Sequence, residues 1–235
     1  GCWICCTSLG GSSAVARNSR PRTAKRWSGP SLVFVAVAWK ATGLHSPTNP
    51  GCSIRAADGG VHYSFLNAFY PDPKVVCMLR DPVDILCSME RNFRKASLQD
   101  PGLVNHSEMV NTSLEKRLDH WVVSPPVGLA MERLQETLRQ GIDQKMLFIR
   151  YEDLCANPRL ELERFYAYVG LPYYGNHDFN NVEQITVEDD EVYGVFGDHQ
   201  IRHKVVPQPS QALEIFGPGL CDWIRQRYGW FYERF

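Results

Sequence analysis

Two short apolar runs, each followed by a helical pattern, stand out along the chain. Residues 75–79 and 146–149 are apolar and bounded by turn signals or polar residues, which is typical of buried strands in a parallel sheet. Apolar residues then recur three and four positions apart after residue 82 and again after residue 158. Strands that alternate with helices in this way predict an α/β fold with a parallel central sheet.

The helix after the first strand has a clear start signal. Asp81 is a candidate N-cap, and Pro82 suits the first helical turn. The expected buried face consists of Ile85, Leu86, Met89 and Phe93. Polar residues and a Pro-Gly pair over residues 94–111 predict a long surface loop behind this helix.

Start and stop signals also bound the other expected helices. Thr112 and Glu115 have the spacing of a capping box, and the helix that follows should end before the Pro-Pro pair at residues 125–126. A second helix over residues 127–140 should stop at Gly141. Asn157 and Pro158 begin another helix, which Gly170 ends. Residues 172–209 read mostly as loop, and the chain closes on a helix with an aromatic tail.

Residues 1–60 differ from the rest of the chain. Residues 1–57 contain no Asp or Glu, and all 26 acids follow them. Three interpretations stay open: an organelle transit segment, a disordered basic tail, or a stretch whose reading frame is wrong. We therefore divide the chain into an atypical segment, 1–60, and an α/β domain, 61–235. The apolar run at 32–39 is too short for a membrane span of about 20 residues and predicts a buried strand.

Composition excludes some functions. The 235 residues carry a formal net charge of −1, which argues against general binding of nucleic acid. Of the eight cysteines, Cys2 and Cys5 form a CxxC, but no second pair at zinc spacing follows, so we expect no metal. This cysteine usage fits a reducing compartment, and we expect a cytoplasmic protein.

Arg80 is the first candidate for chemistry. It ends the first predicted strand, and ligands of open parallel sheets bind at the carboxyl ends of strands. Its guanidinium suits a bidentate grip on phosphate, and Ser88, two turns into the next helix, could reach the same anion. The alternative is structural: Arg80 pairs with Asp81 or Asp84, and Ser88 is merely a small helix residue.

Three segments resemble the sulfotransferase family. Residues 74–90, KVVCMLRDPVDILCSME, resemble its 3′-phosphate-binding motif, in which a Ser follows eight residues after the Arg. Residues 147–172, LFIRYEDLCANPRLELERFYAYVGLP, are similar to its second landmark, and residues 177–205 resemble the late loop of bacterial sulfotransferase-like proteins. The resemblance covers about residues 61–235, and the order of the three segments makes it specific.

The resemblance implies a P-loop-NTPase-like three-layer fold and transfer of a sulfuryl group from 3′-phosphoadenosine 5′-phosphosulfate. The acceptor would be a hydroxyl or amine of a small molecule or glycan. Arg80 and Ser88 would bind the 3′-phosphate, Tyr151 would lie near the adenine, and Arg202 and Lys204 would close over the donor's phosphates. The alternatives are a core aromatic for Tyr151 and a solvated loop for the two basic residues.

The family's first loop is not recognisable. It has the form Gly-x-Pro-Arg/Lys-Ser-Gly, whereas Gly10 to Ser13 offer only Gly-Gly-Ser-Ser, without the Pro or the basic residue. Upstream of Arg80, His62 and Asp58 are the available candidates for the catalytic residue. We select His62, and the alternative for it is a surface or capping role. The rival functions are a sulfotransferase-like nucleotide-binding protein with impaired catalysis and a nucleotide kinase. The absence of a GxxxxGK[ST] run counts against the kinase.

Overall fold

A computed structural model describes residues 34–38, 52–55, 63–69, 72–99, 109, 111–183 and 202–235. Its strands are β1 (Phe34–Ala38), β2 (Cys52–Arg55), β3 (Lys74–Leu79) and β4 (Met146–Arg150). They form one sheet in the order β2-β1-β3-β4. The parallel sheet that the sequence predicts is confirmed for β3 and β4, whereas β1 pairs antiparallel with both β2 and β3.

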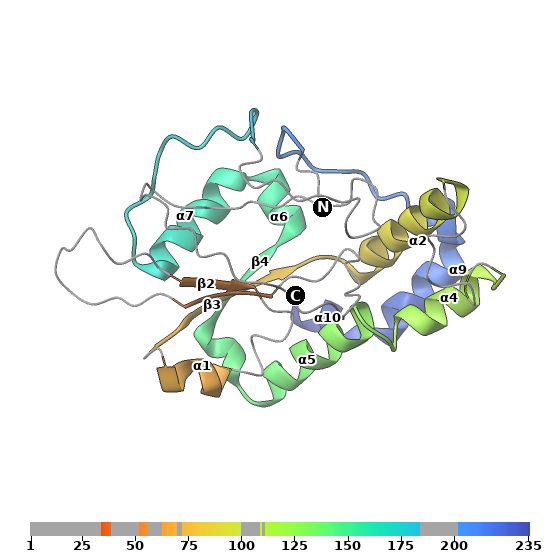
Figure 1. Ribbon diagram of the computed structural model, residues 1–235, viewed down its shortest axis with the longest axis horizontal. Coiled ribbons are helices and arrows are strands. Elements are labelled where there is room, and N and C mark those ends of the chain that lie inside the picture. The colour runs from red at the N-terminus through yellow and green to blue at the C-terminus, as the bar shows by residue number, and fades with distance from the viewer. Residues whose placement is uncertain are drawn as a thin grey trace, which may run out of the picture.

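Helices lie on both sides of this sheet. They are α1 (Tyr63–Phe69), α2 (Pro82–Gln99), α4 (Leu114–Trp121), α5 (Val127–Arg139), the 3-10 helix η1 (Ile142–Lys145), α6 (Tyr151–Ala156), α7 (Pro158–Val169), α9 (Ala212–Arg227) and α10 (Gly229–Arg234). Figure 1 shows α6 and α7 on one side of the sheet and α1, α5 and α10 on the other, with α2, α4 and α9 grouped at one end. The α/β class is therefore confirmed.

The side chains of β3 alternate between two cores, because successive residues of a strand point to opposite faces. Val75, Cys77 and Leu79 belong to the larger core, which α2, α4, α5, α9 and α10 complete. Val76 belongs to a smaller core, where it lies with Ile149 of β4 and with residues of α6 and α7. β3 is thus buried on both faces, as its continuous apolar run predicts.

Most of the predicted helix boundaries are confirmed. Asp81 caps α2, since its Oδ1 accepts a hydrogen bond from the main-chain N–H of Val83 at 2.8 Å, and Asn157 caps α7 through the N–H of Leu160 at 3.3 Å. Gly141 and Gly170 follow α5 and α7 with φ of 66° and 76°, the left-handed conformation that favours glycine at helix ends.

Two local predictions were wrong, and one helix was not predicted. The N-cap of α4 is Ser113, whose hydroxyl accepts from the N–H of Lys116, while the hydroxyl of Thr112 donates to the carbonyl of Met109. Helix α2 continues to Gln99, so residues 94–99 are not loop. Helix α6 begins directly after β4, in a segment for which the sequence pattern gave no prediction.

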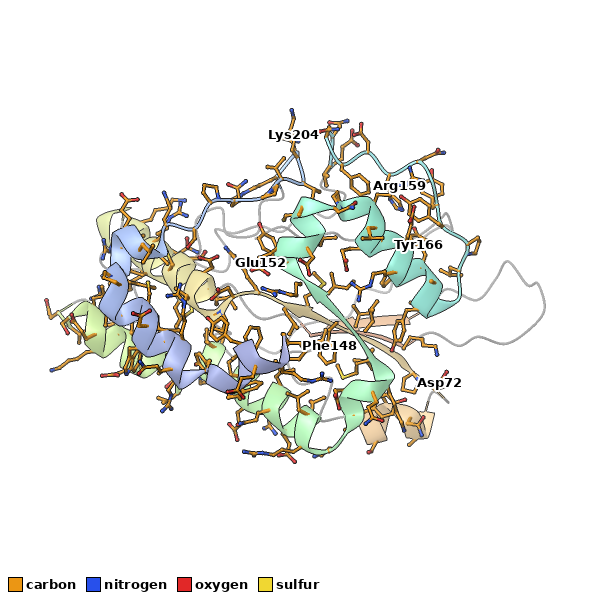
Figure 2. All side chains as sticks on the ribbon, turned by 180° about the vertical axis from the view of Figure 1, so that it is seen from behind. Asp72, Phe148, Glu152, Arg159, Tyr166 and Lys204 are labelled. Carbon is orange, nitrogen blue, oxygen red and sulfur yellow. The ribbon has the colours of Figure 1, made fainter. Side chains whose placement is uncertain are left out.

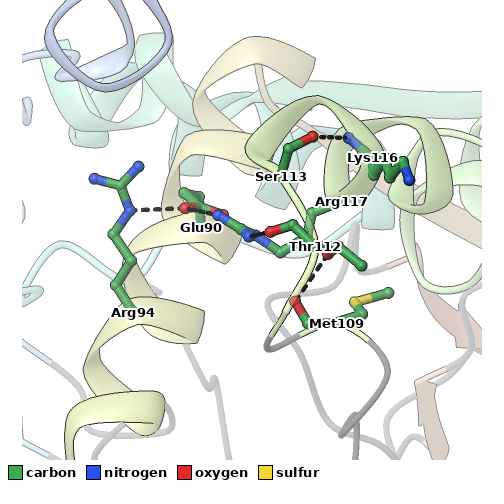
Figure 3. Close-up of polar contacts among 7 residues, drawn as sticks. All are labelled: Glu90, Arg94, Met109, Thr112, Ser113, Lys116 and Arg117. Carbon is green, nitrogen blue, oxygen red and sulfur yellow. Dashed lines mark hydrogen bonds and ion pairs between the residues drawn. The ribbon is translucent and has the colours of Figure 1, made fainter.

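A buried ion pair joins α2 to α4 (Figure 3). The carboxylate of Glu90 is fully buried and accepts hydrogen bonds from Nε of Arg117 at 2.9 Å and from its Nη2 at 2.6 Å. Arg94, one turn further along α2, donates to the same carboxylate at 2.7 Å. Arg117 also donates to the carbonyl of Thr112 at 2.6 Å, just before α4 begins. The pair therefore fixes the position of α4 against the middle of α2.

Candidate functional site

The register of the two parallel strands brings Arg80 and Tyr151 together. Leu79 of β3 lies opposite Arg150 of β4, so the next residue of each strand, Arg80 and Tyr151, emerges at the same edge of the sheet. The guanidinium carbon of Arg80 lies 4.7 Å from the centre of the Tyr151 ring, a cation–π distance. Two of the residues that the sequence singles out are thus direct neighbours.

The guanidinium of Arg80 is not neutralised by a described carboxylate. Its Nε is buried and has no hydrogen-bond partner, and within the described ranges no ion pair involves Arg80. Asp81 is occupied by the N–H of Val83 and by the hydroxyl of Tyr232, and Asp84 accepts a hydrogen bond from Ser210. Because a buried polar atom without a partner is costly, Arg80 is suited to receive an anion.

Glu152 completes this edge of the sheet, and the sequence analysis missed it. Its Oε1 accepts a hydrogen bond from the main-chain N–H of Asp81 at 3.1 Å, which ties the start of α6 to the turn after Arg80. Its Oε2 is buried without a hydrogen bond and lies 3.7 Å from Nε of Arg150. Glu152 is the second residue of the Tyr-Glu-Asp-Leu segment at residues 151–154, in which only Tyr151 is predicted to contact a ligand.

Burial raises the pKa of the Cys155 thiol on α6 above its usual value. The hydrogen bond with Tyr151 and the positive charges of Arg80 and Arg202 oppose this rise, and the negative charge of Glu152 adds to it. The late loop therefore brings a second arginine into electrostatic range of α6. Arg202 itself is exposed.

Two backbone hydrogen bonds hold the end of the late loop. The N–H of Val182 donates to the carbonyl of His203 at 2.8 Å, and the N–H of Val205 donates to the carbonyl of Phe179 at 2.9 Å. Lys204 lies between these contacts and is exposed. Figure 2 shows Lys204 on the late loop, away from the sheet, and Glu152 at the start of α6, close to the sheet.

Of the remaining predicted site residues, the structure describes Ser88 but not His62. Ser88 lies on α2 and is partly buried, and no hydrogen bond joins it to Arg80 within the described part. His62 and the segment from Gly10 to Ser13 lie outside the described residues. Among the residues that the structure describes, no three His, Cys, Asp or Glu side chains group as metal ligands would. No described helix is long and apolar enough to cross a membrane.

A comparison with known families finds a match that covers the region of Arg80 and Tyr151. Residues 60–175, about half of the chain, match a family model described as the sulfotransferase family. This region resembles the sulfotransferase family. The match includes β3, α2, β4, α6 and α7, and therefore contains Arg80, Ser88 and Tyr151. Neither a curated protein nor a solved structure matches the chain. The family match supports an activity of the sulfotransferase type.

Proposed function

We propose that the chain is a sulfotransferase that uses 3′-phosphoadenosine 5′-phosphosulfate as its donor. The acceptor would be a hydroxyl or amine of a small molecule or glycan. One observation carries the choice of donor: within the sulfotransferase-like region, Arg80 stands at the end of a parallel strand with its Nε buried and unpaired. An anionic group of the donor would supply the missing partner.

The proposed contacts follow from the resemblance to the sulfotransferase family, and the contact between Arg80 and Tyr151 supports them. Arg80 and Ser88 would bind the 3′-phosphate, and Tyr151, whose ring lies against Arg80, would border the adenine. Arg202 and Lys204, on the late loop, would approach the donor's other phosphates. The donor itself supplies an activated sulfuryl group. The contribution of the protein to such a transfer is to position the reactants and to neutralise charge on the leaving oxygens.

His62 remains the proposed catalytic residue. It precedes α1 by one residue in the sequence, on the segment that leads to β3. Its role would be to accept the proton of the acceptor hydroxyl as a general base. The protein would act in the cytoplasm, because the four described cysteines are free and buried, which agrees with a reducing compartment.

A second candidate function is binding of the nucleotide without transfer. It is favoured by the sequence from Gly10 to Ser13, which lacks the basic residue that would stabilise the transferring group. A nucleotide kinase is a third, weaker alternative, since no GxxxxGK[ST] run occurs. Binding and turnover assays separate these functions.

The first test measures binding of adenosine 3′,5′-bisphosphate by isothermal titration calorimetry. Arg80→Ala should weaken this binding at least about tenfold, which corresponds to roughly 1.4 kcal/mol. Arg139→Ala is the matched control, because it removes one positive charge from the exposed end of α5. Equal affinities of the wild type and the Arg80 variant would refute the assigned site.

The second test measures transfer of radiolabelled sulfate from the donor to pooled hydroxyl and amine acceptors. Turnover by the wild type that is lost in Arg80→Ala would support the sulfotransferase. Tight binding of the bisphosphate without turnover would favour the binding protein instead. Phosphate transfer from ATP would favour the kinase.

A further inference from the structure

The C-terminal helix α10 holds the turn that carries Arg80. The hydroxyl of Tyr232 donates a hydrogen bond to Oδ1 of Asp81 at 2.7 Å, and the same oxygen accepts from the N–H of Val83. Tyr232 lies 151 residues from Asp81 in the sequence and outside the region that matches the family. The turn between β3 and α2 is therefore held by a part of the chain that the family match does not include.

The same segment also holds the end of β4. Arg150 donates through Nη1 to the main-chain oxygen of Phe235 at 2.8 Å. The ring of Phe235 packs against Phe148, with ring centres 5.0 Å apart. The C-terminal residues thus contact β4 directly and, through Tyr232, the turn that follows β3.

Tyr232 is a hydrogen-bond donor at every physiological pH. Burial, the hydrogen bond to Asp81 and the negative charge of Asp81 all raise the pKa of the Tyr232 hydroxyl, the first of them most. The hydroxyl therefore stays protonated and binds Oδ1 of Asp81, which fixes the orientation of this carboxylate. Asp81 directly follows Arg80 in the sequence, so a free Asp81 carboxylate would be available to compete for the guanidinium.

We propose that Tyr232 is a positioning residue of the 3′-phosphate site. By binding Asp81 it fixes the turn after β3 and keeps this carboxylate from pairing with Arg80, whose guanidinium stays available to a phosphate. The inference rests on the proposed function, because it assigns the 3′-phosphate as the ligand of Arg80.

The test compares two ligands that differ only in the 3′-phosphate. The dissociation constant of adenosine 5′-phosphate is divided by that of adenosine 3′,5′-bisphosphate, each measured by calorimetry on the full chain. Tyr232→Phe should lower this ratio about fivefold, the effect of losing one hydrogen bond of ordinary strength. The control is Tyr228→Phe, whose hydroxyl donates to the carbonyl of Val122 at 3.1 Å and not to Asp81. This control should leave the ratio unchanged.

A double variant tests whether Tyr232 acts on the 3′-phosphate site through Asp81. In Asp81→Asn the amide oxygen can still accept from Val83 and Tyr232, but no carboxylate remains to compete for Arg80. Adding Tyr232→Phe to Asp81→Asn should therefore change the ratio by less than twofold, a non-additive result.

The outcomes separate the inference from the proposed function. A wild-type ratio near one would overturn the proposed function and the inference together. A wild-type preference for the 3′-phosphate that Tyr232→Phe leaves unchanged would overturn the inference alone. The inference alone would also be overturned if Tyr232→Phe lowered the ratio equally in the wild type and in Asp81→Asn. If Tyr232→Phe does not fold, Asp81→Asn decides: a ratio at or above the wild-type value supports the inference, and a lower ratio overturns it.

Discussion

The buried ion pair between α2 and α4 makes a sharp prediction about stability. Arg117→Met removes two of the three hydrogen bonds that Glu90 accepts. Methionine keeps an unbranched apolar side chain at a position that packs against the ring of Phe93, where the guanidinium carbon now lies 4.6 Å from the ring centre. The substitution therefore tests the charge with little loss of packing.

The expected magnitude follows from the burial of Glu90. Its side chain is 0% exposed, and removing one partner of a buried ion pair costs about 3–5 kcal/mol. Arg94 still donates to Glu90, but its own side chain is 51% exposed, so it compensates only in part. We expect a loss of about 3 kcal/mol, which is a large share of the roughly 5–15 kcal/mol by which domains are stable.

Urea denaturation followed by circular dichroism measures this loss. The control is Arg139→Met, because Arg139 pairs with Glu136 only across 3.7 Å on an exposed surface, where pairs contribute little. The double variant Glu90→Leu/Arg117→Met should recover most of the stability, since no buried charge is left unpaired. A loss below about 1 kcal/mol for Arg117→Met, or a double variant as unstable as the single one, would refute this reasoning.

Two further changes have defined outcomes. Tyr168→Phe should destabilise the fold by about 1 kcal/mol in urea denaturation, because the Tyr168 hydroxyl donates to the carbonyl of Lys145 at 2.7 Å and accepts from the N–H of Val75 at 3.1 Å; an unchanged midpoint would contradict this. Burial lowers the pKa of His177, so the unfolded chain takes up the proton more readily and stability falls as the pH drops below about 6.5. His177→Asn should reduce this fall in a pH series of thermal melts, and an identical pH dependence would count against it.

Local signals predicted the parts of the structure that depend on neighbouring residues. The cap at Asp81 and the stop at Gly170 were predicted correctly, because a cap or a left-handed glycine acts within a few residues. The start of α4 was placed one residue too early, since Thr112 and Ser113 are both good caps. The orientation of β1 was not predictable, because an apolar run reads the same in parallel and antiparallel pairings.

The contacts between residues far apart in the sequence are of a different kind. Asp81 and Tyr232 are 151 residues apart, and Glu90 and Arg117 are 27 apart. No pattern of spacing specifies which distant residues meet, because that depends on how the helices pack. Arg80 and Tyr151 are an intermediate case. Once β3 and β4 are known to be parallel neighbours, the residues that directly follow these strands must lie at the same edge of the sheet.

These contacts hold α2 at two separate places. At its start, Asp81 and Asp84 accept hydrogen bonds from Tyr232 and Ser210 of the C-terminal part of the chain. In its middle, Glu90 binds Arg117 of α4. These contacts hold α2 in place relative to Arg80 in the absence of a ligand. Less conformational freedom is then lost when a ligand binds, which lowers the entropic cost of binding.

The two anchors should nevertheless be separable by experiment. Tyr232 acts on the turn that carries Arg80, so its loss should change the preference for a 3′-phosphate. Arg117 acts on Glu90 in the middle of α2, so its loss should lower the free energy of unfolding and leave that preference intact. Such a division would show that the contact between Tyr232 and Asp81 affects binding, while the contact between Arg117 and Glu90 affects stability.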